Sequence, residues 1–266
     1  MENSRDYQIK LMQINFPFLT LMKKNIKILG REEELNILHE SLHKKRLKNT
    51  ILIGNAGCGK TAIIEKFSSE IQENYYVMQL DLTGMVAGTA LRGEFEQKVF
   101  NCLKAIKEFN SKNEKQVILF IDEIHMMYTM GQCRESDTAT LGNMIKPYLS
   151  EGSITVIGAT TEKEYNETIK QDKALVRRLC PIYISNLDMK TVEEILYNFG
   201  SKKVSKQLIR KIIEEAKKLD GNFPDIGIEL LDRCLARAEY RNVPIDEKMI
   251  EKISSEMRRM LEWTKK

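Results

Sequence analysis

The stretch Gly54-Asn55-Ala56-Gly57-Cys58-Gly59-Lys60-Thr61 decides how this chain of 266 residues folds. It matches the pattern G-x-x-x-x-G-K-[ST], a phosphate-binding loop that joins a strand to a helix. Residues 50–53 before it are an apolar, β-branched run, which is typical of a buried strand. Residues 62–73 after it carry apolar side chains at helical spacing and predict a helix. Both flanks therefore have the structure that the loop requires.

The residue types of the loop explain how it would bind a nucleotide. Its glycines allow the backbone to turn without Cβ clashes, so that successive N–H groups face one concavity. The N-terminus of the next helix adds partial positive charge there. Lys60 would reach the β- and γ-phosphates, and the Thr61 hydroxyl would hold Mg²⁺. The expected contacts are Gly54, Asn55, Ala56, Gly57, Cys58, Gly59, Lys60, Thr61 and Ala62. A glycine-rich turn without a ligand is the alternative, which the match at every position disfavours.

The composition is that of a globular protein, with 42% hydrophobic residues. Lys and Arg number 42 against 38 Asp and Glu, a net charge of +4, which is too balanced to indicate binding to nucleic acid or to an anionic membrane. The 5 cysteines are scattered and only 3 histidines occur, which argues against a Cys/His metal site. Reduced thiols in a cytoplasmic protein are the expectation.

Residues 1–24 form an N-terminal segment of unknown role and contain the one candidate for a targeting signal. Residues 11–22 are largely apolar, but they are too few to span a bilayer and include Gln13, Asn15 and Pro17. No basic region precedes them, and no small-residue cleavage site follows. We expect packing on the domain or on a neighbouring chain, and no membrane anchor.

Acidic and hydroxyl side chains follow two further apolar runs. Residues 117–121 end in Asp122 and Glu123, and residues 154–159 end in Thr160 and Thr161. Ligands bind at the carboxyl ends of strands in open α/β sheets. We predict that Asp122 orients Mg²⁺ through its water shell and that Glu123 polarises the attacking water. A strand that merely ends in a surface turn is the alternative, which the phosphate-binding loop disfavours. The expected strands are residues 50–53, 75–81, 117–121, 154–159 and 182–184.

The pattern divides the remaining chain into two domains. Residues 25–187 alternate strands and helices and predict a large α/β nucleotide-binding subdomain with a parallel sheet. Within it, residues 84–93 contain 3 glycines and predict a loop. Residues 188–266 show only helical signals and predict a small subdomain of about four helices, joined by a hinge at 186–188.

Eight stretches together resemble the first nucleotide-binding domain of the Clp family of AAA+ unfoldases, of the ClpA, ClpB and ClpC type. They occur in the family's order and cover residues 27–239. The resemblance implies the AAA+ fold of P-loop NTPases, with a five-stranded parallel sheet, flanking helices and a helical lid. It also implies ATP hydrolysis with Mg²⁺. The stretches are ILGREEEL, NTILIGNAGCGKTAIIEKF, MVAGTALRGEFEQ, ILFIDEIHMM, GNMIKPYL, IGATTEKEY, DKALVRRL and FPDIGIELLD.

The resemblance assigns further roles. Ile28 and Leu29 would line the adenine pocket, and Thr161 would sense the γ-phosphate. Arg177 and Arg178 would be arginine fingers that act on the nucleotide of an adjacent subunit, because a fixed cationic fork can meet the charge of a transferring phosphoryl group. Fingers that act in trans imply a ring, which is a hexamer in this family. The partners would then be protein substrates, gripped by the loop at residues 84–93 in the pore.

Two departures from the family pattern stand out: one in the pore loop, which puts threading in doubt, and one in the lid, where a basic contact near the nucleotide would be lost. The pore loop of the family reads G-x-K-Y-R-G, and its gripping residues here are Gly88, Leu91, Arg92 and Gly93, with Ala90 in place of lysine. In the lid, P-D-K-A has become Pro224-Asp225-Ile226-Gly227, and the glycine costs that helix roughly 1 kcal/mol against alanine.

Two functions therefore stay open. The first is an enzyme that couples ATP hydrolysis to remodelling or unfolding of protein substrates. The second is an ATP-gated assembly or regulatory module that binds a partner without threading it. The chain is expected to form one tier of a two-tier machine, without the family's substrate-collecting domain, its middle coiled coil or its second ATPase domain. A DNA-associated loader is disfavoured, since no basic stripe is visible.

Overall fold

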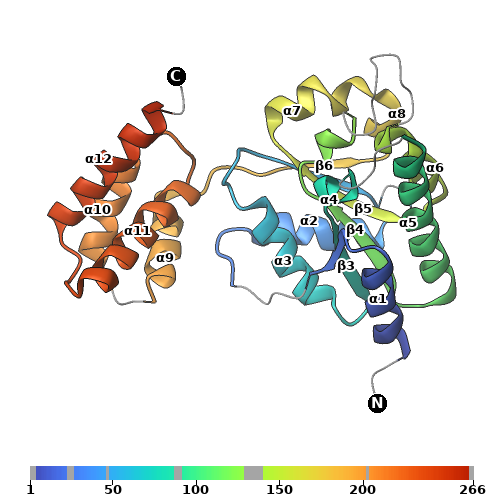
Figure 1. The fold of residues 1–266 in the computed structure, drawn as a ribbon, viewed down its shortest axis with the longest axis horizontal. Coiled ribbons are helices and arrows are strands. Elements are labelled where there is room, and N and C mark those ends of the chain that lie inside the picture. The colour runs from blue at the N-terminus through green and yellow to red at the C-terminus, as the bar shows by residue number, and fades with distance from the viewer. Residues whose placement is uncertain are drawn as a thin grey trace. The chain divides into compact units, whose positions relative to one another are not determined.

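A computed structural model of the chain describes residues 4–22, 27–45, 48–86, 92–128, 140–201 and 204–263. The chain divides into two compact units, which are described separately (Figure 1). The α/β unit comprises Met1–Lys27, Glu32–Gly54 and Lys60–Tyr183. The helical unit comprises Ile28–Arg31, Asn55–Gly59 and Ile184–Lys266.

The α/β unit is built on a 6-stranded sheet in the order β1-β3-β4-β5-β2-β6. The five expected strands are present and parallel, which confirms the predicted fold class. A further strand, β1, pairs antiparallel with β3 at the edge of the sheet and was not expected. It has only 3 residues and follows Pro17, so no alternating pattern marks it in the sequence. The bounds are β1 (Leu19–Leu21), β2 (Thr50–Ile53), β3 (Tyr75–Leu80), β4 (Gln116–Ile121), β5 (Thr155–Thr160) and β6 (Cys180–Tyr183).

The strand register brings the predicted polar residues to one end of the sheet. Ile53, the last residue of β2, lies opposite Thr160, the last residue of β5. Ile121, the last residue of β4, lies opposite Gly158 of β5. The residues that follow β2, β4 and β5 therefore gather at what we call the carboxyl end of the sheet. All four residues of β2 are buried, as expected for a parallel strand covered on both faces.

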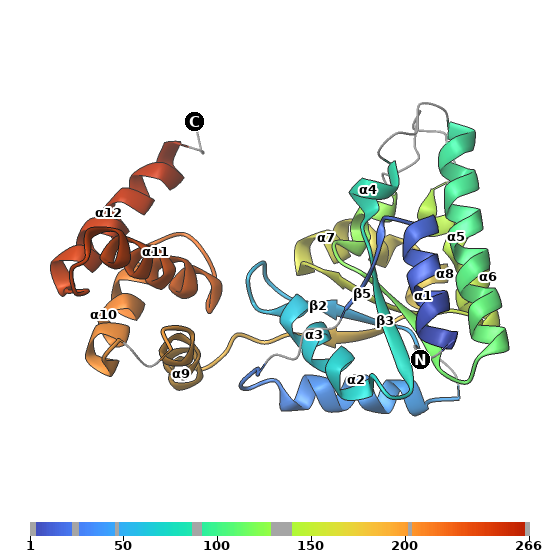
Figure 2. The ribbon, with the colours of Figure 1, turned by 60° about the horizontal axis from the view of Figure 1, so that its bottom comes forward.

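Helices cover both faces of this sheet (Figure 2). Helices α1, α5 and α6 lie on one face, where their apolar side chains share a core with those of the strands. Helices α2 and α3 lie on the other face. The helices are α1 (Ser4–Asn15), α2 (Glu32–His43), α3 (Lys60–Ile71), α4 (Leu82–Val86), α5 (Arg92–Lys112), α6 (Leu141–Glu151), α7 (Glu162–Glu167) and α8 (Lys173–Val176), with the 3-10 turns η1 (Ile124–Tyr128) and η2 (Ile169–Gln171).

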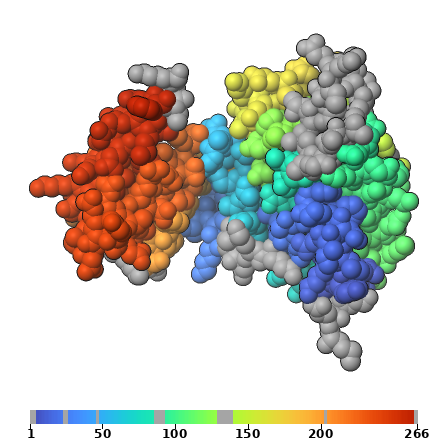
Figure 3. All heavy atoms as spheres, in the orientation of Figure 1, coloured from blue at the N-terminus to red at the C-terminus, as the bar shows by residue number. Residues whose placement is uncertain are grey.

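The structure bears on two predictions for this unit, those for the loop at residues 84–93 and for the N-terminal segment. The predicted loop at residues 84–93 is wrong at both ends, since α4 continues to Val86 and α5 begins at Arg92. The N-terminal segment packs on the unit, where Ile9 is buried and the Tyr76 hydroxyl donates to Asp6 Oδ1 at 2.7 Å. Figure 3 shows α1 beside α5 on one face of this unit. Throughout the described ranges, we find no helix with the length and apolarity needed to cross a membrane.

The helical unit contains the expected four helices, α9 (Met189–Phe199), α10 (Lys206–Ala216), α11 (Asp225–Arg241) and α12 (Glu247–Trp263). Their apolar faces form one core, which includes Leu196 and Leu230. Gly227 is explained by close packing, because an added Cβ would lie 3.1 Å from Leu196 Cδ1 and 3.1 Å from Phe223 Cε1. The absent side chain therefore lets α11 approach its neighbours.

Candidate active site

The phosphate-binding loop leaves the carboxyl end of β2 and is tied to the neighbouring strand. The Gly54 N–H donates to the Thr160 carbonyl oxygen at 3.2 Å. Lys60, the first residue of α3, is buried, and its Nζ donates to the Gly54 carbonyl oxygen at 2.9 Å. Gly57 and Gly59 have φ angles of +73° and +95°, which side chains with a Cβ rarely adopt. The loop thus has the backbone that the motif predicts.

Arg31 supports this loop, and no sequence motif gave it a role. Its side chain is buried in the helical unit, where Nη2 donates to the Cys58 carbonyl oxygen and Nη1 to the Ser185 carbonyl oxygen, both at 2.8 Å. The guanidinium therefore joins the loop to the chain segment that leads into α9. The signal available in the sequence was its place in ILGREEEL, one of the stretches that carry the family resemblance.

Asp122 and Thr61 form a set of oxygen ligands that suits Mg²⁺. The Thr61 hydroxyl donates to Asp122 Oδ2 at 3.0 Å, and the Glu123 N–H donates to Asp122 Oδ1 at 3.0 Å. Mg²⁺ prefers hard oxygen ligands and is commonly held by one or two carboxylates together with substrate phosphates. A carboxylate and a hydroxyl side by side, next to a phosphate-binding loop, fit this requirement.

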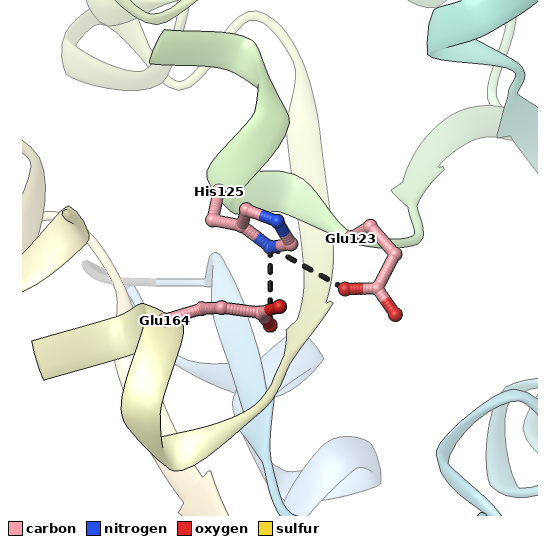
Figure 4. Close-up of side chains that lie close together, drawn as sticks. All are labelled: Glu123, His125 and Glu164. Atoms are coloured by element: carbon pink, nitrogen blue, oxygen red, sulfur yellow. Dashed lines mark ion pairs between the residues drawn. The ribbon is translucent and has the colours of Figure 1, made fainter. Parts of the chain in front are cut away.

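Glu123 lies beside His125 and Glu164 at the same end of the sheet (Figure 4). His125 Nδ1 is 3.3 Å from Glu123 Oε2 and 3.3 Å from Glu164 Oε2. Burial raises the pKa of the Glu123 carboxyl, and the charges of Glu164 and Asp122 raise it further, while His125 and Lys60 oppose this rise. Neither His125 nor Glu164 was predicted as a site residue. Both lie in stretches that carry the family resemblance, ILFIDEIHMM and IGATTEKEY, but their nearness to Glu123 depends on contacts between η1 and α7.

The two threonines after β5 have different surroundings. Thr160 is fully buried, and its hydroxyl donates to Glu164 Oε2 at 3.3 Å. Thr161 is the N-cap of α7, and its side chain forms a capping box with Glu164. The hydroxyls of Thr160 and Thr161 therefore both donate to the carboxylate of Glu164. The structure brings Thr161, the predicted sensor, to the same end of the sheet as Glu123, and its hydroxyl serves as a helix cap.

The two predicted arginine fingers lie elsewhere, at what we call the amino end of the sheet. Arg178 Nε donates to the Ser150 hydroxyl at 2.7 Å, and Arg178 Nη1 donates to the Ala174 carbonyl oxygen. Arg177 is exposed and has no side-chain hydrogen bond or ion pair with the described part of the chain. Arg177 and Arg178 line a hollow together with residues at the starts of β2, β4 and β5 and with two lysines. The strand residues are Asn49, Gln116, Ile154 and Thr155, and the lysines are Lys45 and Lys48.

The remaining predicted site residues are only partly described. Ile28 and Leu29 are half-buried and belong to the helical unit. Of the predicted pore loop, Gly88 and Leu91 lie outside the described residues. Arg92 and Gly93 start α5.

Comparison with known proteins agrees with this geometry. The model of the AAA family, described as the ATPase family associated with various cellular activities, matches residues 50–186. The chain belongs to the AAA family of ATPases. The match runs from the first residue of β2 to the segment beyond β6, and thus includes all five parallel strands.

This AAA chain is similar to proteins named as the chaperone ClpB. It is 37% identical over 229 residues to that of Mycoplasma pneumoniae, which covers 79% of this chain and 31% of the relative. It is 34% identical over 238 residues to that of Staphylococcus aureus (strain COL), which covers 82% of this chain and 27% of the relative. The chain spans less than a third of the length of these curated relatives. The resemblance to the Clp family is confirmed.

Solved structures of Hsp104 are similar to this AAA chain in fold. The Hsp104–ADP complex of S. cerevisiae has a TM-score of 0.76 at 28% identity, and the match covers 93% of this chain and 45% of the other. A closed state of Hsp104 with ATPγS and FITC casein has a TM-score of 0.73 at 29% identity, and covers 87% of this chain and 43% of the other.

Proposed function

We propose that this AAA chain hydrolyses ATP with the residues at the carboxyl end of its sheet. The loop N–H groups and Lys60 bind the phosphates, and Glu123 orients the attacking water. Thr161 senses the γ-phosphate, and Ile28 and Leu29 contact the adenine. The observation that carries the proposal is the convergence of the loop, Asp122 and Glu123 at the ends of β2 and β4, the two parallel strands on either side of β5. Ligands bind in this place in open α/β sheets.

Mg²⁺ is part of the proposal, with Thr61 and Asp122 as the residues that would hold it. When bound, the ion neutralises charge on the phosphate oxygens. Asp122 Oδ2 already receives the Thr61 hydroxyl at 3.0 Å, so both oxygens point to one place. Lys60 adds a positive charge at the start of the same helix as Thr61, where its Nζ donates to the Gly54 carbonyl oxygen at 2.9 Å.

The substrates that we propose are proteins, remodelled by a hexameric ring in the cytoplasm. The support is the similarity to ClpB, which is named as a chaperone, and to Hsp104 structures that contain casein. The place of Arg177 and Arg178 at the amino end of the sheet also supports a ring, because an arginine there meets a nucleotide only in another subunit. In the ring, Gly88, Leu91, Arg92 and Gly93 would contact the substrate.

An ATP-gated binding module is the second candidate. Leu91 and Ala90 favour it, because they replace the aromatic and basic residues with which the family grips polypeptide. This module would assemble with a partner when ATP is bound and would not thread it. Leu91→Asp separates the two candidates, since threading would lose its stimulation by unfolded protein, whereas nucleotide-dependent complex formation would be unchanged.

The test is ATP turnover per chain as a function of protein concentration, with Glu123→Gln as the blank. If each active site is shared between two subunits, turnover per chain should rise with protein concentration, and unfolded polypeptide should raise it further. Turnover that stays at the level of the blank, although ATP binds, would reject hydrolysis by this chain alone. Turnover that is independent of concentration would reject the ring.

A further inference from the structure

Glu164 accepts three hydrogen bonds at the carboxyl end of the sheet. Its Oε2 accepts from the Thr161 hydroxyl at 2.7 Å, from the Thr161 N–H at 3.1 Å and from the Thr160 hydroxyl at 3.3 Å. Burial alone would raise the pKa of this carboxyl, but the bonds from Thr161, the nearby His125 and the bond from Thr160 together outweigh it and lower the pKa. Glu164 is therefore a fixed, charged acceptor.

His125 connects this acceptor to Glu123. Its Nδ1 lies 3.1 Å from the Thr160 hydroxyl oxygen and 3.3 Å from a carboxylate oxygen of each glutamate (Figure 4). The ring is mostly buried, with 19% of the side chain exposed, whereas the Glu123 side chain is 47% exposed. The mostly buried His125 ring, which lies against Glu164, thus contacts the more exposed carboxylate of Glu123.

The local sequence explains why the ring is held in place. Gly158 in β5 has no side chain, and an added Cβ would lie 2.5 Å from Ile124 Cδ1. The 3-10 turn that carries His125 therefore packs directly on β5, next to Thr160. Glu123 has a φ of 49°, a left-handed conformation that non-glycine residues adopt at a cost. The backbone is thus bent where Glu123 turns toward His125.

We propose that His125 and Glu164 are positioning residues, which hold the Glu123 carboxylate in the orientation that it needs to polarise water. The proposal rests on the assigned role of Glu123 in hydrolysis. Glu164 anchors the ring, and the ring places Nδ1 3.3 Å from Glu123 Oε2, a buried oxygen without a hydrogen-bond partner in the described part of the chain, while the other oxygen stays available. Because Glu164 also receives the hydroxyls of Thr160 and Thr161, the predicted sensor and the catalytic glutamate are linked through Glu164 and the His125 ring.

The same three side chains also offer the ligands of a metal site, since one atom of each lies within 4.8 Å of the others. Glu164 Oε2, however, already accepts the N–H and hydroxyl of Thr161 and the hydroxyl of Thr160. An ion on this oxygen would have to displace them and open the cap of α7. The contacts therefore favour a network of hydrogen bonds over a metal.

Two matched pairs of variants test the proposal. Glu164→Gln keeps the capping box, which accepts Gln as well as Glu, but removes the charge that anchors the ring, whereas Glu164→Ala removes both. His125→Asn keeps an N–H donor near the position of Nδ1, whereas His125→Ala removes it. The measurements are kcat and KM for ATP, nucleotide affinity by fluorescence titration, and the midpoint of urea unfolding.

We expect Glu164→Gln and His125→Ala each to lower kcat by about 10- to 100-fold, the cost of a misplaced reacting group, with KM and nucleotide affinity unchanged. His125→Asn should restore part of kcat. The double variant Glu164→Gln/His125→Ala should be no slower than His125→Ala, since both act through one contact.

Three outcomes overturn the proposal. A kcat that is unchanged in Glu164→Gln and His125→Ala shows that Glu123 does not need them. A raised kcat shows that they restrain it instead. A loss that follows only the unfolding midpoint, and is therefore confined to Glu164→Ala, shows a structural role. If the wild type and Glu123→Gln turn over ATP equally, the assigned role of Glu123 fails first, and the proposal falls with it.

Discussion

The two ends of the parallel sheet differ in how their polar residues are used. At the carboxyl end, Lys60, Asp122 and Glu123 all have close partners within the α/β unit. At the amino end, Arg177 is exposed and its side chain has no polar partner in the described part of the chain. A strand rises about 3.3 Å per residue, so the ends of β5, from Thr155 to Thr160, are roughly 17 Å apart.

This separation decides which nucleotide the arginines can serve. Arg177 and Arg178 lie beside Asn49 and Thr155, which are at the starts of β2 and β5. The phosphates would lie beyond the opposite ends of the same strands. An arginine side chain does not span the length of a strand, so under the proposed function its target would be in a second copy of the chain. The carboxyl end would then form a nearly complete site, and the amino end would supply the arginine that this site lacks.

The largest expected effect follows from this division. Arg177→Ala should lower kcat by about 10³-fold, as expected for loss of an arginine finger, and leave the affinity for ATP unchanged. Mixing Arg177→Ala with Glu123→Gln, each inactive alone, should restore turnover. In the mixed ring, the intact Arg177 of one variant faces the intact Glu123 of the other.

Turnover of the mixture gives the clearest test of the comparison. If the arginine acted within its own chain, no mixture of the two variants would contain a complete site, and turnover would stay at the blank level. The control is a mixture of Arg177→Ala with Glu123→Gln/Arg177→Ala, which has no arginine to supply. Activity in that control would contradict the role of Arg177.

The next effect concerns the phosphate-binding loop that follows the carboxyl end of β2. Gly57→Ala should weaken ATP binding by about 30-fold, or about 2 kcal/mol, because its φ of +73° strains any residue with a Cβ and that Cβ would lie 2.6 Å from Asp225 Cβ. Fluorescence titration with a nucleotide analogue measures the affinity. The Gly57→Ala chain should still restore turnover to Arg177→Ala, since its amino end is unchanged.

Gly59→Ala is the matched control for that prediction. Its φ of +95° gives comparable backbone strain, but an added Cβ meets nothing within 4 Å. It should therefore weaken ATP binding less than Gly57→Ala does. Equal losses in the two variants would show that backbone strain alone, and not the contact with Asp225, sets the requirement for glycine.

A smaller effect is expected at the amino end. The buried Asn49 side chain accepts the Val156 N–H at 2.9 Å and donates to the Arg178 carbonyl oxygen at 3.3 Å. Asn49→Ala leaves the Val156 N–H without this partner and should lower the free energy of unfolding by about 1.5 kcal/mol in urea titration. A loss below about 0.5 kcal/mol would contradict the importance of the Val156 bond.

The carboxyl end was predictable from the sequence because its residues follow strands directly. The phosphate-binding loop, Asp122 and Glu123 each adjoin an apolar run, and parallel strands align their ends without further information. The five parallel strands were predictable for the same reason. The short strand β1 was not, since 3 residues show no period and its pairing depends on the exposed edge of β3.

Residues that act through contacts between elements were not predictable. His125 and Glu164 each stand in a stretch that carries the family resemblance, but they meet because η1 packs on β5 at Gly158, a tertiary contact that neither stretch shows by itself. The hydrogen bonds of the buried Arg31 side chain to two carbonyl oxygens were unpredictable for the same reason, since Cys58 and Ser185 are distant in sequence. Gly227 was expected to weaken a helix, whereas the structure shows that its missing Cβ makes room for Leu196 and Phe223.

The smallest expected effect separates the two arginines at the amino end. Ser150→Ala removes the oxygen that accepts Arg178 Nε–H at 2.7 Å, a partly exposed bond whose loss should change the free energy of unfolding by less than about 0.5 kcal/mol. If Arg177 is the finger and Arg178 shapes the segment before β6, turnover should also change less than about twofold. A tenfold loss of kcat with ATP affinity unchanged would instead mean that Ser150 aims Arg178 at the neighbouring nucleotide. Both arginines would then act across the subunit boundary, and the amino end would be as precisely arranged as the carboxyl end.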